Sequence, residues 1–132
     1  MKYQEIKAEA EKRLSTLLTE CGVFWAFSNE QFEQNKTPLK EGEKYVSIGM
    51  GGYMPKGNIQ AFSQGNKDLA AWQKAEIKKY KQQDEQIKYE LYNHECFYTG
   101  DVERVCELLP DVPKDRILKV YHEERRNQPQ TA

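Results

Sequence analysis

The stretch that decides the fold is KYVSIGMGGYMPKGN, residues 44–58, which carries an apolar run into a cluster of glycines. Its first part, KYVSIG at residues 44–49, alternates its side chains between two faces in the manner of a β-strand. The second part contains three glycines, Pro55 and Lys56. Asn58 is then predicted to cap a following helix. We interpret this stretch as a sharp bend that joins a strand to a helix.

The residues before this bend predict a helix and a second strand. An apolar residue recurs every three or four positions between Tyr3 and Cys21, which indicates a helix that Gly22 ends in a left-handed conformation. VFWAF, residues 23–27, is apolar on both alternating faces, as expected of a strand covered on both sides. Ser28 and Gln31 have the spacing of a capping box, so a short helix should follow.

The residues after the bend predict helices only. An interruption is expected at Gly65-Asn66, and a long helix with one apolar seam then runs to about Tyr98. Roughly 30 residues at about 1.5 Å each give a rod of about 45 Å, so we expect a bend or a partner along it. Two short helices follow, with Asp101 capping the first and Pro113 opening the second.

These elements predict an α+β fold that is mostly helical. A two-stranded sheet (about 23–27 and 44–49) is expected to pack with the N-terminal helix, the long central helix and the two short C-terminal helices. Residues 1–123 should form a single globular domain, and residues 124–132 a polar flexible tail.

Composition narrows the class of protein. Hydrophobic residues make up 38% and charged residues 31% of the 132 residues, which excludes a disordered chain. The net charge of −1 supplies no general attraction for nucleic acid. The sequence has no apolar run of membrane-spanning length and no secretion signal, so we expect a cytoplasmic protein without a membrane partner. The three scattered cysteines are expected to be reduced.

The glycine-rich bend is the first candidate binding site. A strand, a glycine turn and a helix start can aim backbone N–H groups at an anion, with Lys56 adding positive charge. The spacing matches neither the P-loop nor the dinucleotide fingerprint, so a bend is the better-supported interpretation. The candidate binding residues here are Gly49, Gly51, Gly52, Tyr53, Met54 and Lys56.

The second candidate site is ELYNHECFYTGD, residues 90–101, at the predicted end of the long helix. His94 would titrate near neutrality beside a helix C-terminus, but its place in the apolar seam favours a hydrogen-bonded core residue. We predict no catalytic residue, metal site or cofactor, because no zinc spacing or nucleophile motif is present and each cysteine has apolar neighbours. The candidate binding residues are Tyr92, Asn93, His94, Glu95, Phe97, Tyr98 and Asp101.

Three motifs together, VFWAFSNEQF, YVSIGMGGYMPKGN and ELYNHECFYTGD, resemble those of a small uncharacterised domain family of bacteria, prophages and phages. The similarity extends from about Gly22 to Tyr121. The resemblance implies an intracellular accessory protein of mobile elements that inhibits a host defence protein such as a CRISPR effector. The inhibitory role is inferred from the association of such proteins with mobile elements and not from a physical mechanism.

Two hypotheses about function follow. The first is a non-enzymatic protein that binds a protein partner through exposed aromatic and methionine side chains, with Tyr53, Met54, Tyr92 and Phe97 as anchors. The alternative is a small-ligand or nucleotide site, catalytic or not, which requires the glycine bend and residues 93–101 to be neighbours. Nucleic-acid binding by the basic run KAEIKKYK has weak support because acidic residues interleave with it, and a homo-oligomer remains open.

Overall fold

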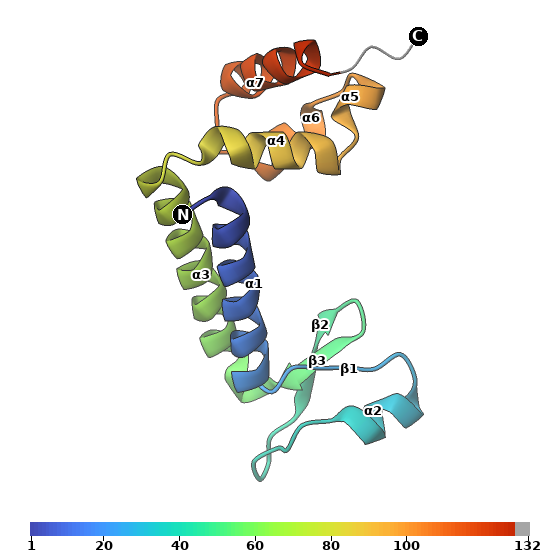
Figure 1. Ribbon diagram of the computed structural model, residues 1–132. Helices are drawn as coiled ribbons and strands as arrows, with labels where there is room; N and C mark the ends of the chain where they lie inside the picture. The colour runs from blue at the N-terminus through green and yellow to red at the C-terminus, as the bar shows by residue number, and fades with distance from the viewer. Residues whose placement is uncertain (129–132) are drawn as a thin grey trace. The chain divides into compact units, whose positions relative to one another are not determined.

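The computed structural model describes residues 1–128, which form an α+β fold that is mostly helical, as predicted (Figure 1). The chain divides into two compact units. Residues 4–75 form the first, which we call the sheet unit, and the second, the helical unit, comprises residues 1–3 and the chain from Glu76 onward. None of the helices in the described part of the chain is long and apolar enough to cross a lipid bilayer.

The sheet unit contains a three-stranded antiparallel sheet, with strands β1 (Phe24–Trp25), β2 (Tyr45–Gly49) and β3 (Gly52–Pro55) in the order β1-β3-β2. The predicted sheet of two strands was therefore one strand short. The bend does not lead into a helix but reverses the chain into β3 through a two-residue turn. Met50 and Gly51 form this turn with φ of 52° and 80°, and positive φ at both positions is the signature of a type I′ hairpin.

Helix α2 (Asn29–Asn35) covers one face of the sheet (Figure 1). Its Phe32 joins Phe24, Tyr45 and Tyr53 in a cluster whose ring centroids lie 5.1–5.7 Å apart. The predicted cap is confirmed, since the Ser28 hydroxyl accepts from the Gln31 N–H at 3.1 Å. These aromatic contacts fix the face that Phe24 occupies.

The opposite face of β1 is not covered as VFWAF predicted. Trp25 is 47% exposed and Phe27, just beyond the strand, is 78% exposed. The prediction of a strand buried on both faces was wrong, since β1 is an edge strand and the side chains of Trp25 and Phe27 are exposed.

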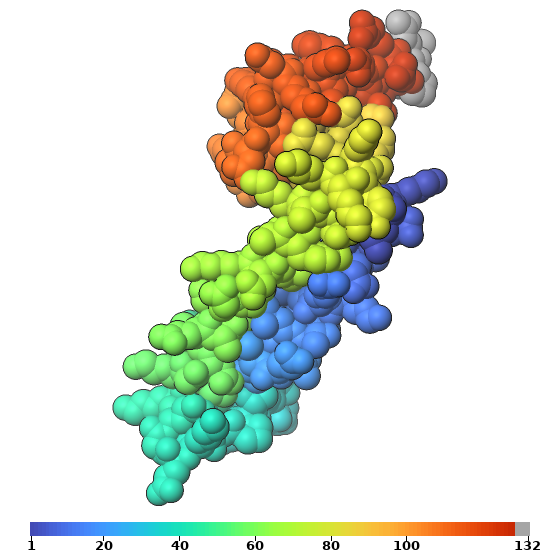
Figure 2. Space-filling model, turned by 90° about the vertical axis from the view of Figure 1, so that its left-hand side faces the viewer, coloured from blue at the N-terminus to red at the C-terminus, as the bar shows by residue number. Residues whose placement is uncertain are grey.

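Helices α1 (Tyr3–Glu20) and α3 (Ile59–Lys79) pack along one another in the sheet unit (Figure 2). Gly22 ends α1 as predicted, with φ of 72°. Helix α3 continues through Gly65 without interruption. The glycine instead allows close contact between the two helices. A Cβ placed there would lie 2.4 Å from Leu17 Cδ1. A 3₁₀ turn, η1 (Lys56–Asn58), precedes α3, and the Asn58 side chain donates to the Cys21 carbonyl at 2.8 Å instead of capping α3.

The helical unit contains α4 (Gln83–Asn93), α5 (Cys96–Thr99), α6 (Glu103–Leu108) and α7 (Lys114–Arg126). The predicted long helix is not continuous: α3 ends at Lys79 and α4 runs from Gln83 to Asn93, so the chain breaks where a bend was one expectation, and the helix stops short of Tyr98. Lys81 and Glu95, just after these ends, have φ of 55° and 53°, so the backbone turns there. The buried core of this unit is Ile87, Leu91, Cys96, Val102, Val105, Val112, Ile117, Val120 and Tyr121.

The two short C-terminal helices, α6 and α7, confirm the prediction. An Asp101 carboxylate oxygen accepts from the Glu103 N–H at 2.9 Å, and Pro113 immediately precedes α7. Helix α7 continues to Arg126, three residues into the segment predicted as a tail. The end of that segment, residues 129–132, lies outside the described residues.

Candidate functional site

The residues selected from the sequence belong to two different units of the structure. Gly49, Gly51, Gly52, Tyr53, Met54 and Lys56 lie in the sheet unit, whereas Tyr92, Asn93, His94, Glu95, Phe97, Tyr98 and Asp101 lie in the helical unit. The two groups are therefore two candidate regions, one in each unit.

The glycines of the hairpin have a steric reason of their own. A Cβ on Gly51 would lie 2.4 Å from Phe27 Cε1, and one on Gly52 would lie 2.7 Å from Trp25 Cζ3 and 2.8 Å from Ile48 Cγ1. These distances are far below van der Waals contact, so the absent side chains let two aromatic rings lie on the backbone. An anion cradle needs a glycine turn that opens into a helix, and this turn opens into β3.

Two of the predicted anchors pack within the sheet unit. Met54 is 1% exposed, and Tyr53 is half-buried with its ring stacked on Phe24 at 5.7 Å. Their burial indicates a packing role within the sheet unit. Lys56 begins η1 and is exposed.

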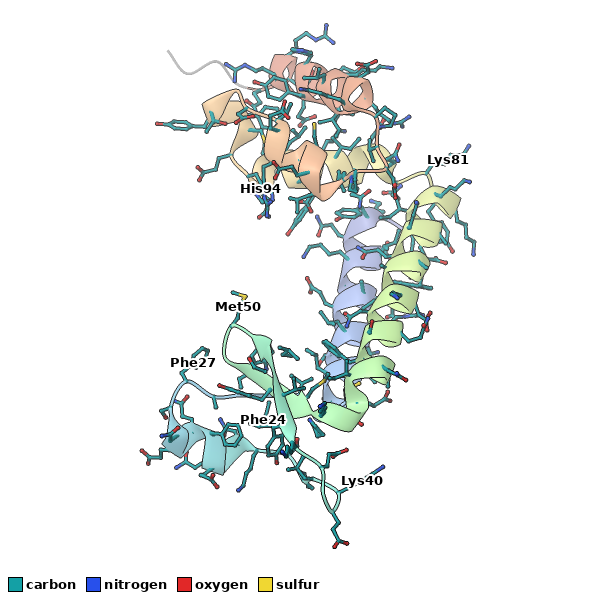
Figure 3. The ribbon with its side chains drawn as sticks, turned by 180° about the vertical axis from the view of Figure 1, so that it is seen from behind. Phe24, Phe27, Lys40, Met50, Lys81 and His94 are labelled. Carbon is teal, nitrogen blue, oxygen red and sulfur yellow. The ribbon has the colours of Figure 1, made fainter. Side chains whose placement is uncertain are left out.

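Exposed apolar side chains lie near the β2–β3 turn, and with the half-buried Ile48 of β2 we call them the hairpin patch: Trp25 in β1, Phe27 just beyond it and Met50 in the turn. Met50 is 92% exposed at the turn, and Figure 3 shows it beside Phe27, while Phe24 lies toward α2. Ile48 is half-buried, and its side chain, like that of Trp25, occupies the space that a Cβ on Gly52 would need. This patch was not predicted from the sequence, although the alternation in VFWAF separates Phe24 and Ala26 from Trp25 and Phe27 and is the signal that reveals it.

The helical unit has a hollow of about 350 Å³ lined by residues of α4 and α5, by Glu95 between them and by Gln128, which follows α7. Four predicted residues line it, and sequence reasoning missed the fifth; the lining is Tyr92, Glu95, Phe97, Tyr98 and Gln128. The Tyr92 hydroxyl donates to Glu124 Oε1 at 2.8 Å, which places a residue of the predicted tail beside the site. The sequence carried no signal for Glu124 or Gln128, because both are brought in by tertiary packing.

The other predicted residues of this group do not line the hollow. His94 Nε2 lies 3.3 Å from Glu90 Oε2, one helical turn away on α4, and Asp101 serves the first turn of α6. Asn93 is the last residue of α4 and is exposed. Within residues 1–128 no cluster of three or more His, Cys, Asp or Glu side chains could hold a metal ion.

The buried thiols are electrostatically unsuited to nucleophilic attack. Burial raises the pKa of Cys21, and the nearby Glu20 carboxylate adds to the effect. Burial likewise raises the pKa of Cys96, with a contribution from Asp101. Because the thiolate is the reactive form, both side chains are held in their unreactive state at neutral pH.

Comparison with known proteins gives one match. A model described as a family of unknown function (DUF7659) matches residues 3–126. No curated protein and no solved structure matches the chain.

Proposed function

Since the chain belongs to this family of unknown function, we propose from the geometry that it is a non-enzymatic binding protein whose hairpin patch docks onto a protein partner. The observation that carries the proposal is the exposure of Trp25 in β1, Phe27 just beyond it and Met50 in the β2–β3 turn, all at one small sheet. Aromatic and methionine side chains are the ones that dominate the buried centres of protein interfaces.

The backbone of the hairpin supports this proposal. Met50 takes the left-handed conformation, with φ of 52°, in a turn where glycine, asparagine and aspartate are the favoured residues. A polar residue would suit both the turn and its exposure to water better than methionine. Backbone strain combined with an exposed apolar side chain is a feature of sites that contact a ligand or partner.

A protein partner fits the surroundings of the patch better than nucleic acid does. The sheet unit mixes acidic and basic residues, including Glu30, Glu33, Lys36, Lys40 and Glu43, and the whole chain has a net charge of −1. Nucleic acid would be bound by a basic surface, because phosphate contacts dominate its affinity. Mixed charges around an apolar centre are the usual composition of a protein interface.

The resemblance of the sequence motifs to a phage and prophage family extends the proposal to an inhibitor of a host defence protein. Its support is that resemblance alone. The hairpin patch supports only the wider class of protein binding.

The proposal is tested by affinity capture with matched variants from a lysate of the source cells. The double variant Phe27→Ala/Met50→Ala removes the two most exposed side chains of the patch. Each anchor is expected to contribute about 2 kcal/mol to binding, so partner recovery should fall by more than about tenfold. Stability should change by no more than about 0.5 kcal/mol, because both side chains are exposed.

Leu39→Ala is the matched control, because Leu39 is an exposed apolar residue of the same unit outside the patch. It should capture the same partner as the unaltered chain. Recovery of one protein at equal levels by all three baits would remove the patch from consideration, as would the absence of any protein retained specifically by the unaltered chain.

A further inference from the structure

The hollow in the helical unit is lined by three aromatic rings, from Tyr92, Phe97 and Tyr98, one carboxylate, from Glu95, and one amide, from Gln128. Its volume of about 350 Å³ lies at the small end of the range for ligand sites, roughly 300–1,000 Å³. Tyr98 lines the hollow and is 91% exposed, so the hollow is open to solvent at this residue.

The remaining rings are held in place by neighbours. Phe97 stacks on Tyr121 with centroids 5.2 Å apart and planes 7° from parallel, and its ring lies 4.8 Å from that of Tyr92. Tyr92 is anchored in turn by the hydrogen bond from its hydroxyl to Glu124. Two walls of the hollow are thus set before any ligand arrives, which reduces the entropy lost on binding.

The backbone at Glu95 brings the lining residues together. Its φ of 53° ends the path of α4, and α5 starts at the next residue. The Glu95 carbonyl then accepts from the Tyr98 N–H at 3.0 Å. A left-handed glutamate is an uncommon conformation, and here it places its own carboxylate in the same lining as the two aromatic residues that follow it.

The chemistry of this lining selects a cation. The face of an aromatic ring is negative and attracts a positive charge, and a carboxylate in the same wall adds to the attraction. The Tyr92 hydroxyl donates its hydrogen to a carboxylate, which increases the electron density of that ring. Two nearby basic side chains have partners: Arg125 Nη1 donates to the neutral Phe97 carbonyl at 2.6 Å and keeps its charge, and Lys88 Nζ lies 3.2 Å from Glu85 Oε1 and 4.0 Å from Glu124 Oε2.

We propose that this hollow binds a quaternary ammonium group. Such a cation has no N–H hydrogens, so it loses little hydrogen bonding on leaving water, and aromatic rings with a carboxylate are the environment that recognises it. The group can come from a small molecule such as choline or from a trimethylated lysine side chain. This site is separate from the hairpin patch and does not depend on the function proposed for it.

The test is a titration of the ¹⁵N-labelled full chain followed by amide NMR shifts. The probes are choline, its neutral isostere 3,3-dimethylbutan-1-ol, and the amide of acetylated trimethyllysine. We expect saturable shifts in residues 92–98 with at least one of the two cations, and binding of the isostere at least about fivefold weaker, since only the charge differs. The tighter of the two cations identifies the source of the group.

Two variants separate a cation site from an apolar hollow. Tyr98→Leu keeps an apolar side chain but removes the ring, and Glu95→Gln removes the charge; each should weaken choline about fivefold. Tyr80→Leu is the control, because Tyr80 is another exposed tyrosine outside the hollow. Equal affinity for choline and its isostere, unchanged affinity in Tyr98→Leu, or no saturable shift with either cation would overturn the proposal.

Discussion

Replacement of Met50 by asparagine should make the protein more stable. Met50 has φ of 52°, and the left-handed conformation costs an ordinary residue about 1–2 kcal/mol, a cost that asparagine largely avoids. Less than a tenth of Met50 is buried. Full burial of a methionine contributes about 1.5–3 kcal/mol, so the packing lost is at most about 0.3 kcal/mol. The net expectation is a gain of about 1 kcal/mol in the free energy of unfolding.

The gain can be measured by thermal unfolding followed through tryptophan fluorescence. Both tryptophans, Trp25 and Trp72, lie in the sheet unit, so the signal reports the unit that carries the hairpin. A gain of about 1 kcal/mol should raise its Tm by about 3–5 °C. The same variant should bind the partner more weakly, because it removes the apolar side chain at the turn. An unchanged or lower Tm would refute the argument that methionine strains this turn.

Lys81→Asn is the matched control variant, because it should relieve backbone strain at a residue outside the hairpin patch. Lys81 has φ of 55° after α3, and its N–H donates to Lys78 while that of Gln82 donates to Ile77, which is the hydrogen-bond pattern of a helix end that favours glycine or asparagine. Its stability should rise by about 0.5–1 kcal/mol, measured by far-ultraviolet circular dichroism. Partner binding should stay at the level of the unaltered chain, and a loss of binding would show that relief of strain alone alters the docking surface.

Two further variants test the packing. Gly65→Ala should destabilise the chain by about 1–2 kcal/mol in urea unfolding, because overpacking against Leu17 outweighs the better helix propensity of alanine. In a Leu17→Ala background the same change should stabilise the chain by about 0.5–1 kcal/mol. A loss of stability in both backgrounds would contradict the contact between Gly65 and Leu17. The free energy of unfolding should fall as pH rises above about 8.5: the pKa of Cys21 and Cys96 is raised in the folded state, so the unfolded chain loses these protons first. A double Cys→Ala variant should lose this part of the decline, and a decline of the same size in that variant would exclude the thiols as its cause.

The elements that were predicted correctly from the sequence are those that begin or end at residues with common capping or terminating roles. Gly22 ends α1 with a left-handed φ of 72°, as glycine commonly does, and Ser28 caps α2. These residues have a strong local preference for the conformations that they adopt. Local preference and tertiary structure agree at such positions, so a single sequence is enough.

The errors cluster at residues that adopt a conformation against their preference. Met50, Lys81 and Glu95 are the non-glycine residues with positive φ in the described chain. Because methionine is not expected in a type I′ turn, the hairpin was not predicted. Because lysine and glutamate are not expected at positive φ, the helix ends near Lys81 and Glu95 were not predicted either. Gly65 was misjudged for the opposite reason, since its role is contact with α1 and not interruption of α3. The candidate site divides similarly: Tyr92, Glu95, Phe97 and Tyr98 gather around one hollow, whereas Met54 is in the core.

The central claim, that the hairpin patch contacts a protein partner, is tested most directly by crosslinking in the source cells. A photoreactive phenylalanine analogue at position 50 should form a light-dependent adduct of one defined mass, because Met50 is expected to be buried in the complex. The same analogue at position 39, on an exposed residue of the same unit outside the patch, should not form it. No adduct from position 50, or the same adduct from both positions, would contradict the account.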